Sequence, residues 1–231
     1  MNGVLYGIGV GPGDPELLTL KGARLIRECD LIAVPDSGMD ERIALDIVRE
    51  HIAGKQVVFC KLPMVRDELE LAKSREIAAD LLCKELDSGK NIAFLTLGDV
   101  TIYSTYLYLH EIITARGYHA EMVAGVPSFC AAAAALGVGL CEAEQSLHIY
   151  PASYPGTEKA LQQEGIKVLM KSGKKLEGLV ALLRQENLLS HSAMVERVGM
   201  AGERLVSDMT DFEGESGYLS TVIVKGNIKD K

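Results

Sequence analysis

The sequence has no tryptophan, few other aromatic residues and no block of positive charge. Aromatic residues make up 5% of the 231 positions, and the formal net charge is −8 at pH 7. Nucleic acids and anionic membranes are bound by clustered lysine and arginine, so this balance argues against both partners. No apolar run approaches the roughly 18 residues that span a bilayer, and the first residues lack the charged segment of a signal peptide. We therefore expect a cytoplasmic protein.

Cysteine and histidine are also sparse, with five of each, and they are scattered along the chain. The sequence contains no Cys-x-x-Cys pair and no close histidine pair with metal-ligand spacing. An odd number of cysteines in apolar or helical runs predicts free thiols in the core. These cysteines are Cys29, Cys60, Cys83, Cys130 and Cys141. The sequence therefore predicts neither a disulfide framework nor a protein-bound metal.

Glycine is abundant near the start, in YGIGVGPGDPELLTLKGA at residues 6–23. A dinucleotide-binding loop has glycines at the first, third and sixth positions directly before a helix. Counted from Gly7 the sixth position is Pro12, and counted from Gly9 it is Asp14. Asp14 followed by Pro15 is typical of a helix N-cap, which places a carboxylate where a phosphate would bind. The pattern therefore disfavours NAD binding.

Apolar runs typical of strands alternate with helical patterns through the first half of the chain, at 4–10, 30–35, 56–60 and 91–97. The clearest helix covers 67–89, where Gly89 supplies a stop and one face is shared by Ala78, Leu81, Leu82 and Leu86. From about residue 123 the strands follow one another with fewer helices. We predict two α/β domains, 1–122 with a mostly parallel sheet and 123–231 with a mixed sheet.

The loops that follow the expected strands are rich in Gly, Pro, Asp and Ser, and open α/β sheets bind ligands at these strand ends. The most informative loop is LTLGDVTIYST at 95–105. Gly98 permits close backbone approach, and the Asp99 carboxylate could accept from an amine or from sugar hydroxyls. The alternative is that Asp99 bonds downstream amides as a helix cap. This loop alone does not decide between them.

Six motifs occur in order along the chain: VGPGDPELLTLKG, LGDVTIYST, AGVPSFCAAAA, VLMKSG, MVERVGM and YLSTVIV. In this order they resemble the tetrapyrrole methylases, which are S-adenosylmethionine-dependent enzymes of cobalamin and siroheme synthesis. The resemblance covers essentially the whole chain. Within the family, the sequence is most similar to the C-20 methyltransferases that act on precorrin-2 or cobalt-factor II.

The resemblance implies a homodimer of two-domain subunits, with a ligand cleft between the two α/β domains. It also implies S-adenosyl-L-methionine as methyl donor, S-adenosyl-L-homocysteine as its product, and a tetrapyrrole small-molecule substrate. The residues it assigns to the donor are Gly98, Asp99, Ile102, Tyr103, Ser128, Phe129, Met170, Lys171, Val198, Gly199 and Thr221.

The same resemblance places Pro12 beside the tetrapyrrole, in a Gly-Pro-Gly turn that would form a cleft wall. Some relatives carry an aspartate as a base at the end of the second strand, where this chain has Pro35 and then Asp36. Turn propensities favour a loop start at these two residues, so we assign no catalytic base. Many relatives have Gly-Gly-Asp-Pro where this chain has Leu97-Gly98-Asp99-Val100.

A polycarboxylate substrate needs local cations in a chain of net charge −8. Candidates that are equally well interpreted as solvated surface residues are Lys61, Arg66, Lys171, Lys174 and Lys175. Other functions also remain open. Another tetrapyrrole methylase such as a uroporphyrinogen-III methyltransferase, a diphthine synthase or an rRNA methylase would share the donor loops. A nucleotide-dependent oxidoreductase and a non-catalytic ligand-binding module are alternatives from other classes.

Overall fold

The computed structural model describes residues 2–37, 42–65, 67–152, 156–172, 176–212, 214 and 216–225. The chain divides into two compact units, Met1–Pro127 and Ser128–Lys231. Each unit has a sheet of its own. The division predicted from the sequence, after residue 122, falls inside the last strand of the first sheet.

The first unit is built on a five-stranded parallel sheet with the order β3-β2-β4-β1-β5. Its strands are β1 Val4–Gly9, β2 Leu31–Asp36, β3 Gln56–Lys61, β4 Ile92–Thr96 and β5 His119–Val123. Its helices are α1 Leu20–Glu28, α2 Arg42–Ile47, α3 Glu68–Asp87 and α4 Tyr106–Ala115. Every residue of β4 is buried, as expected for a central strand with helices on both faces.

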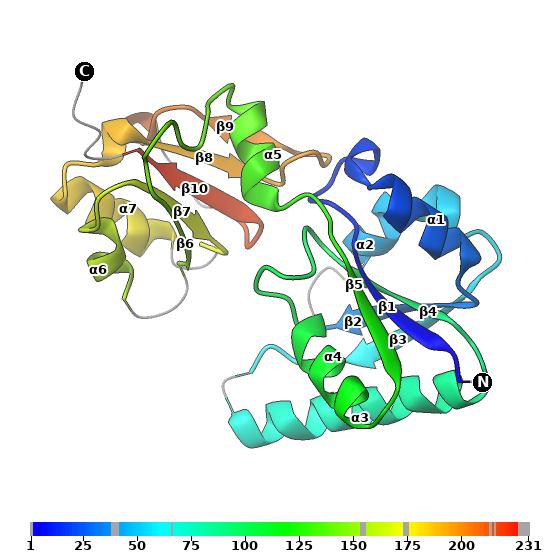
Figure 1. Ribbon diagram of the computed structural model, residues 1–231. Coiled ribbons are helices and arrows are strands. Elements are labelled where there is room, and N and C mark those ends of the chain that lie inside the picture. The colour runs from blue at the N-terminus through cyan, green and yellow to red at the C-terminus, as the bar shows by residue number, and fades with distance from the viewer. Residues whose placement is uncertain are drawn as a thin grey trace. The chain divides into compact units, whose positions relative to one another are not determined.

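Two apolar clusters hold these helices on opposite faces of the sheet (Figure 1). In one cluster, Leu5 and Phe94 of the sheet pack with Leu82 of α3 and Leu109 of α4. In the other cluster, the strand residues pack with α1 and α2. Because β-strand side chains alternate between faces, neighbouring residues of one strand enter different clusters.

The helix starts follow local capping chemistry. The Asp14 side chain accepts from the Glu16 N–H at 2.9 Å, with Pro15 opening a short 3₁₀ helix, Pro15–Leu17. The predicted Asp14 cap is therefore confirmed. Asp67 caps α3 in the same way by accepting from two backbone N–H groups. Such caps contribute about 1 kcal/mol each.

The expectation that Pro35 and Asp36 begin a loop is wrong, because they are the last two residues of β2 and pair with Cys60 and Lys61 of β3. The Asp36 carbonyl bonds to β3 through the Leu62 N–H, while the Leu31 N–H points to the β4 side. Pro35 therefore also faces the β4 side, where the pairing of β2 with β4 has already ended at Ala33. A proline there loses no ladder hydrogen bond.

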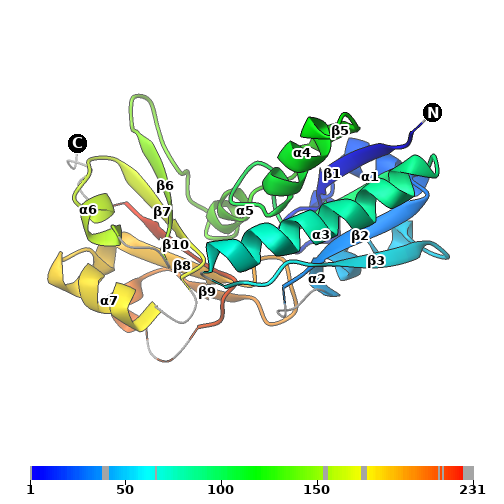
Figure 2. The ribbon, with the colours of Figure 1, turned by 90° about the horizontal axis from the view of Figure 1, so that it is seen from below.

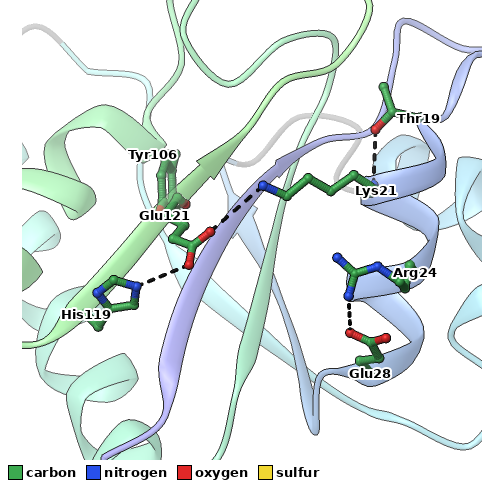
Figure 3. Close-up of polar contacts among 8 residues, drawn as sticks. Thr19, Lys21, Arg24, Glu28, Tyr106, His119 and Glu121 are labelled. Carbon is green, nitrogen blue, oxygen red and sulfur yellow. Dashed lines mark hydrogen bonds and ion pairs between the residues drawn. The ribbon is translucent and has the colours of Figure 1, made fainter.

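An ionic contact ties α1 to the edge strand β5. Lys21 of α1 reaches over the sheet to Glu121 of β5, with 4.0 Å between Nζ and Oε2 (Figure 3). His119 lies 3.2 Å from the other carboxylate oxygen of Glu121. These side chains are exposed, so the contacts contribute little to stability.

The second unit contains a mixed sheet with the order β6-β7-β10-β8-β9, in which only β6 and β7 are parallel. Its strands are β6 Leu147–Pro151, β7 Ile166–Met170, β8 Ser192–Glu196, β9 Arg204–Val206 and β10 Ser220–Val224. Its helices are α5 Ser128–Ala135, α6 Thr157–Leu161 and α7 Leu176–Gln185. Helix α5 packs on β8 and β10, whereas α6 and α7 lie on the other face of this sheet (Figure 1). No helix in the described part of the chain has both the length and the apolar character to cross a membrane.

The expectation of core thiols holds for three of the five cysteines. Cys29, Cys60 and Cys83 are buried, and burial raises the pKa of the Cys29 and Cys60 thiols to about 12. Cys130 and Cys141 are exposed, which corrects the prediction for these two. Cys130 lies on the outer side of α5, where the apolar pattern of an alanine-rich helix does not distinguish its faces.

Lys167 of β7 is fully buried, and its Nζ has no hydrogen-bond partner among the described residues. Burial lowers the pKa of this amine from 10.5, and the nearby Glu164 acts more weakly in the opposite direction. Below pH 10.5 the unfolded chain therefore binds a proton more readily than the folded chain does, and this difference destabilises the fold.

We predict that Lys167→Met raises the free energy of unfolding at pH 7 by about 1–3 kcal/mol. The gain should shrink as the pH rises toward 10.5, because the unfolded amine then also becomes neutral. Urea titrations at several pH values measure this, with Lys159→Met on the exposed side of α6 as the control. A Lys167→Met protein less stable than wild type throughout would contradict the prediction.

Candidate functional site

Three glycines meet where β1, β4 and β5 end. A Cβ built on Gly9 would lie 2.7 Å from both the Gly125 nitrogen and the Gly98 carbonyl oxygen. A Cβ on Gly125 would overlap that same oxygen. Because a side chain at Gly9 or Gly125 would push these backbones apart, both positions must carry glycine for the three loops to lie together, and Gly98 contributes its carbonyl oxygen to the contact. We call this contact of Gly9, Gly98 and Gly125 the glycine junction.

The opening glycine-rich loop joins this junction through its backbone. The Gly98 N–H donates to the Gly11 carbonyl at 2.7 Å, and the Gly11 N–H donates back at 3.2 Å. Both residues have positive φ, +83° at Gly11 and +76° at Gly98. The amide of Gly11 is therefore already bonded within the protein and does not point at a phosphate.

The side chain of Asp99 holds the loops of the glycine junction together through hydrogen bonds. It is 7% exposed, and one carboxylate oxygen accepts from the Thr101 N–H at 2.8 Å and from the Thr101 hydroxyl. The other oxygen accepts from the Gly125 N–H at 2.8 Å. Asp99 therefore bonds a downstream amide, as the capping interpretation expected, but it does so within a turn, because α4 begins only at Tyr106. Asp99 also links the β4 loop to the β5 loop. A contact between Asp99 and a ligand remains a prediction.

The rest of the 99–105 loop is more open. Ile102 is half-buried, while Tyr103 is 42% exposed and has a left-handed backbone with φ of 49°. A left-handed tyrosine costs free energy that surrounding contacts must offset, and such residues cluster at functional sites. Pro12 is buried beside the junction, and Pro35 and Asp36 are half-buried at the end of β2. Their contact with a tetrapyrrole stays a prediction.

In the second unit, the sheet brings together residues that are distant in sequence. Thr221 of β10 pairs with Met170 at the end of β7 and with Val195 of β8. Lys171 follows Met170 directly and has φ of 58°, and Arg197 follows β8 with φ of 53°. The predicted residues Met170, Lys171 and Thr221 therefore share one end of this sheet, with left-handed backbone after both β7 and β8.

The other predicted donor residues of this unit lie in the loop after β8 and at the start of α5. Val198 is buried, and Gly199 is exposed and donates its N–H to the Glu203 carboxylate at 2.6 Å. Ser128 and Phe129 are the first residues of α5, where Phe129 is buried and Ser128 half-buried. Because α5 packs on β10, these two residues belong to an element that contacts the strand of Thr221.

The residues predicted to bind the substrate carboxylates differ in their burial. Lys171 is half-buried, and burial lowers the pKa of its amine. Lys61 is exposed at the end of β3. Arg66, Lys174 and Lys175 lie outside the described residues. Across the described residues, no group of three or more His, Cys, Asp and Glu side chains is arranged to hold a metal ion.

Two buried hydroxyls near these loops have no hydrogen-bond partner among the described residues. Thr96 Oγ1 lies two residues before Gly98, and Ser220 Oγ lies next to Thr221. An unpaired buried hydroxyl costs about 1–3 kcal/mol. Both oxygen atoms are closed off from solvent, so an external ligand does not reach them in this structure, and they do not bear on donor binding.

The sequence alone assigns no role to Gly9 or Gly125, and it places Gly11 only in the turn of the expected cleft wall. The signal was nevertheless present, because each glycine lies within or just after an apolar strand run, where glycine marks close backbone approach. Which backbone approaches which could not be known before the strand order was known.

A parallel α/β unit with ligand-type loops at its strand ends, joined to a unit with a mixed sheet, is the architecture of a small-molecule enzyme. A sequence profile of the Tetrapyrrole (Corrin/Porphyrin) Methylases matches residues 4–211. The chain belongs to this family.

Individual relatives agree with the family match. A "Probable cobalt-precorrin-2 C(20)-methyltransferase" of Methanocaldococcus jannaschii is 32% identical, over 96% of this chain and 95% of that protein. A "Cobalt-precorrin-2 C(20)-methyltransferase" of Salmonella typhimurium is 33% identical, over 97% of both. A solved uroporphyrin-III C-methyltransferase of Thermus thermophilus, complexed with S-adenosylhomocysteine, has a TM-score of 0.74 at 19% identity, over 97% of this chain and 98% of that one. The last likeness shows a common fold.

The glycine junction predicts that Gly125→Ala lowers the free energy of unfolding by about 1–3 kcal/mol, because the new methyl group must push backbone apart. Gly178→Ala in α7 is the matched control, since a Cβ there meets nothing within 4 Å. That change should stabilise the protein by up to about 1 kcal/mol. Urea denaturation of both variants measures the difference, and equal effects would show that the junction is not tight.

Proposed function

We propose that this protein is an S-adenosylmethionine-dependent methyltransferase that adds a methyl group to C-20 of precorrin-2 or its cobalt form in cobalamin biosynthesis. The supporting observation is the near full-length identity of 32–33% to two relatives named for that reaction. Both names specify the cobalt form, which favours a cobalt-containing substrate here. The resemblance further supports a homodimer that works in the cytoplasm.

We propose that residues of both units bind the methyl donor. In the first unit these are Gly98, Asp99, Ile102 and Tyr103, positioned by the glycine junction. In the second unit they are Ser128, Phe129, Met170, Lys171, Val198, Gly199 and Thr221.

The donor supplies a methyl group on a positively charged sulfonium, whose charge disperses as the methyl leaves. No acid is needed to assist the leaving group, so the work of the protein is to hold the methyl and the nucleophilic carbon in line. Such positioning is worth up to ~7–11 kcal/mol in favourable cases. Loops fastened by backbone bonds and by a buried carboxylate suit that task because their geometry varies little.

A uroporphyrinogen-III methyltransferase is the second candidate within the family. The solved enzyme of that activity shares the fold, so the fold does not select the acceptor. The selection rests on the identity over almost the whole chain to C-20 enzymes.

Donor binding can be tested at Thr221, which is 5% exposed on β10. S-adenosylhomocysteine should raise the melting temperature of the wild type by mass action. Thr221→Val keeps the shape of the side chain and removes one hydroxyl, so its dissociation constant should rise by about 2–13-fold, the value of one hydrogen bond. Thr114→Val near the end of α4 is the control and should leave the constant unchanged. An unaltered constant in Thr221→Val would remove Thr221 from the site.

The acceptor atom is tested by isotope labelling. With labelled methyl donor and either precorrin-2 or cobalt-factor II, one labelled methyl group should appear, and carbon NMR should place it at the C-20 bridge. Because regiochemistry is a matter of positioning, a displaced macrocycle should lose rate more than affinity. Label at a pyrrole-ring carbon such as C-2 or C-7, or transfer only to uroporphyrinogen III, would overturn the C-20 assignment and leave the family assignment intact.

A further inference from the structure

The first unit has a small notch beside the proposed donor loop. Its lining residues are Leu62, Pro63, Leu71, Ser74, Arg75 and Thr105. We call it the Arg75 notch. Its volume of about 30 Å³ leaves space for roughly two water molecules. The notch therefore accommodates a single carboxylate group and is far too small for a whole macrocycle.

Among the described residues, Arg75 is the one charged residue that lines the notch. Its guanidinium carbon lies 3.6 Å from the centroid of the Tyr108 ring. The guanidinium is half-buried, and among the described residues no carboxylate forms an ion pair with it. The contact with the Tyr108 ring holds the guanidinium in position without using its N–H groups in an ion pair. A fixed guanidinium fork matches a carboxylate.

The nearby acidic residues Asp67, Glu68 and Glu76 do not form an ion pair with Arg75. The Asp67 carboxylate caps α3 by accepting from Leu69 and Glu70. Glu76 pairs with Arg116 at 2.6 Å. Glu68 lies seven residues before Arg75, which corresponds to about 10 Å along the helix axis. Arg75 is thus an uncompensated cation in a chain of net charge −8.

Apolar surface beside the notch is exposed. Met64, which follows the lining residue Pro63, is 54% exposed, and Tyr108, whose ring contacts Arg75, is 45% exposed. Apolar surface next to a stacked arginine suits a ligand that is itself a flat hydrocarbon ring with charged arms. A hydrated inorganic anion would make no use of these side chains.

The position of the notch connects it to the methyl donor. Leu62 directly follows β3, and Thr105 ends the loop that starts at Gly98 and Asp99. Figure 2 shows α3 and α4, which carry Arg75 and Tyr108, lying side by side. The notch is therefore at the carboxyl ends of parallel strands, where α/β sheets bind ligands, and one loop joins it to the glycine junction.

We propose that Arg75, held in place by Tyr108, binds one carboxylate side chain of the tetrapyrrole and thereby contributes to the affinity for the macrocycle. The exposed apolar residues contact the hydrocarbon part of the same arm and ring. This inference rests on the proposed function. It adds a specific anchor for the acetate or propionate arms that a polycarboxylate macrocycle carries.

The test compares Arg75→Gln with Arg24→Gln, which removes the same charge from α1 on the opposite face of the sheet, where Arg24 pairs with Glu28. The readouts are KM and kcat with cobalt-factor II, the dissociation constant of uroporphyrin by fluorescence, and that of S-adenosylhomocysteine. Arg75→Gln should raise KM and the uroporphyrin constant about tenfold or more, since a charge-assisted bond is lost. Its kcat and its donor affinity should stay within about twofold of wild type, because a contact to a remote arm is made equally in the ground state and in the transition state.

Two further variants distinguish the contribution of the Arg75 charge from that of its contact with Tyr108. Arg75→Lys keeps the charge without the planar fork and should bind uroporphyrin with intermediate affinity. Tyr108→Leu keeps the guanidinium and removes its stacking partner, so the constant should rise by about 2–5-fold, the value of one exposed cation–π contact. Tyr108→Leu also serves as the test if Arg75→Gln does not fold.

The outcomes distinguish this inference from the proposed function. If the wild type transfers methyl to C-20 while Arg75→Gln keeps wild-type KM and uroporphyrin affinity, the anchor is overturned and the function stands. If Arg24→Gln weakens binding equally, the effect is long-range charge, and the anchor is also overturned. If the wild type transfers no methyl to any tetrapyrrole and does not bind uroporphyrin, the proposed function fails, and the anchor fails with it.

Discussion

The close contact of Gly9, Gly98 and Gly125 is the constraint on which the proposed site in the first unit depends. It allows the loops after β1, β4 and β5 to lie against one another, and the Asp99 carboxylate then bonds across the contact. Without it, the 99–105 loop would have neither a fixed start nor a fixed direction. The parallel sheet brings the three strand ends to one edge, and the glycines allow the loops that follow them to touch.

The sequence supports the fold more fully than the site. Strand runs, the cap at Asp14 and the long helix through Leu82 follow from periodicity and local chemistry, which act over a few residues. Pro35 was misassigned because turn propensity does not include strand order, and strand order decides that its missing N–H faces an unpaired edge. Cys130 was misassigned because an alanine-rich helix gives no amphipathic signal. In both cases the deciding information is tertiary.

The two units present their proposed donor residues by different means. In the first unit, glycines carry the positive φ values at Gly11 and Gly98, where the backbone is unstrained, and the left-handed residue with a side chain is the uncharged Tyr103. In the second unit Lys171 and Arg197 adopt left-handed backbone at the ends of β7 and β8, where a side chain is retained at some cost. Both residues that keep a side chain at these strand ends are cations. A lysine or arginine at that position contributes charge as well as a turn, which glycine cannot do.

The negative net charge of the chain explains why individual cations matter for binding a polycarboxylate. A protein of net charge −8 repels a polycarboxylate at long range, so attraction must come from cations placed at short range. Such cations are effective only if intramolecular carboxylates do not neutralise them. Arg116 illustrates the opposite case, because Glu76 and Asp80 hold it at 2.6 and 2.9 Å. Arg75, one residue before Glu76, stacks on Tyr108 instead. Glu76 of α3 thus belongs to a structural ion pair, whereas the adjacent Arg75 is the cation that we propose for the ligand.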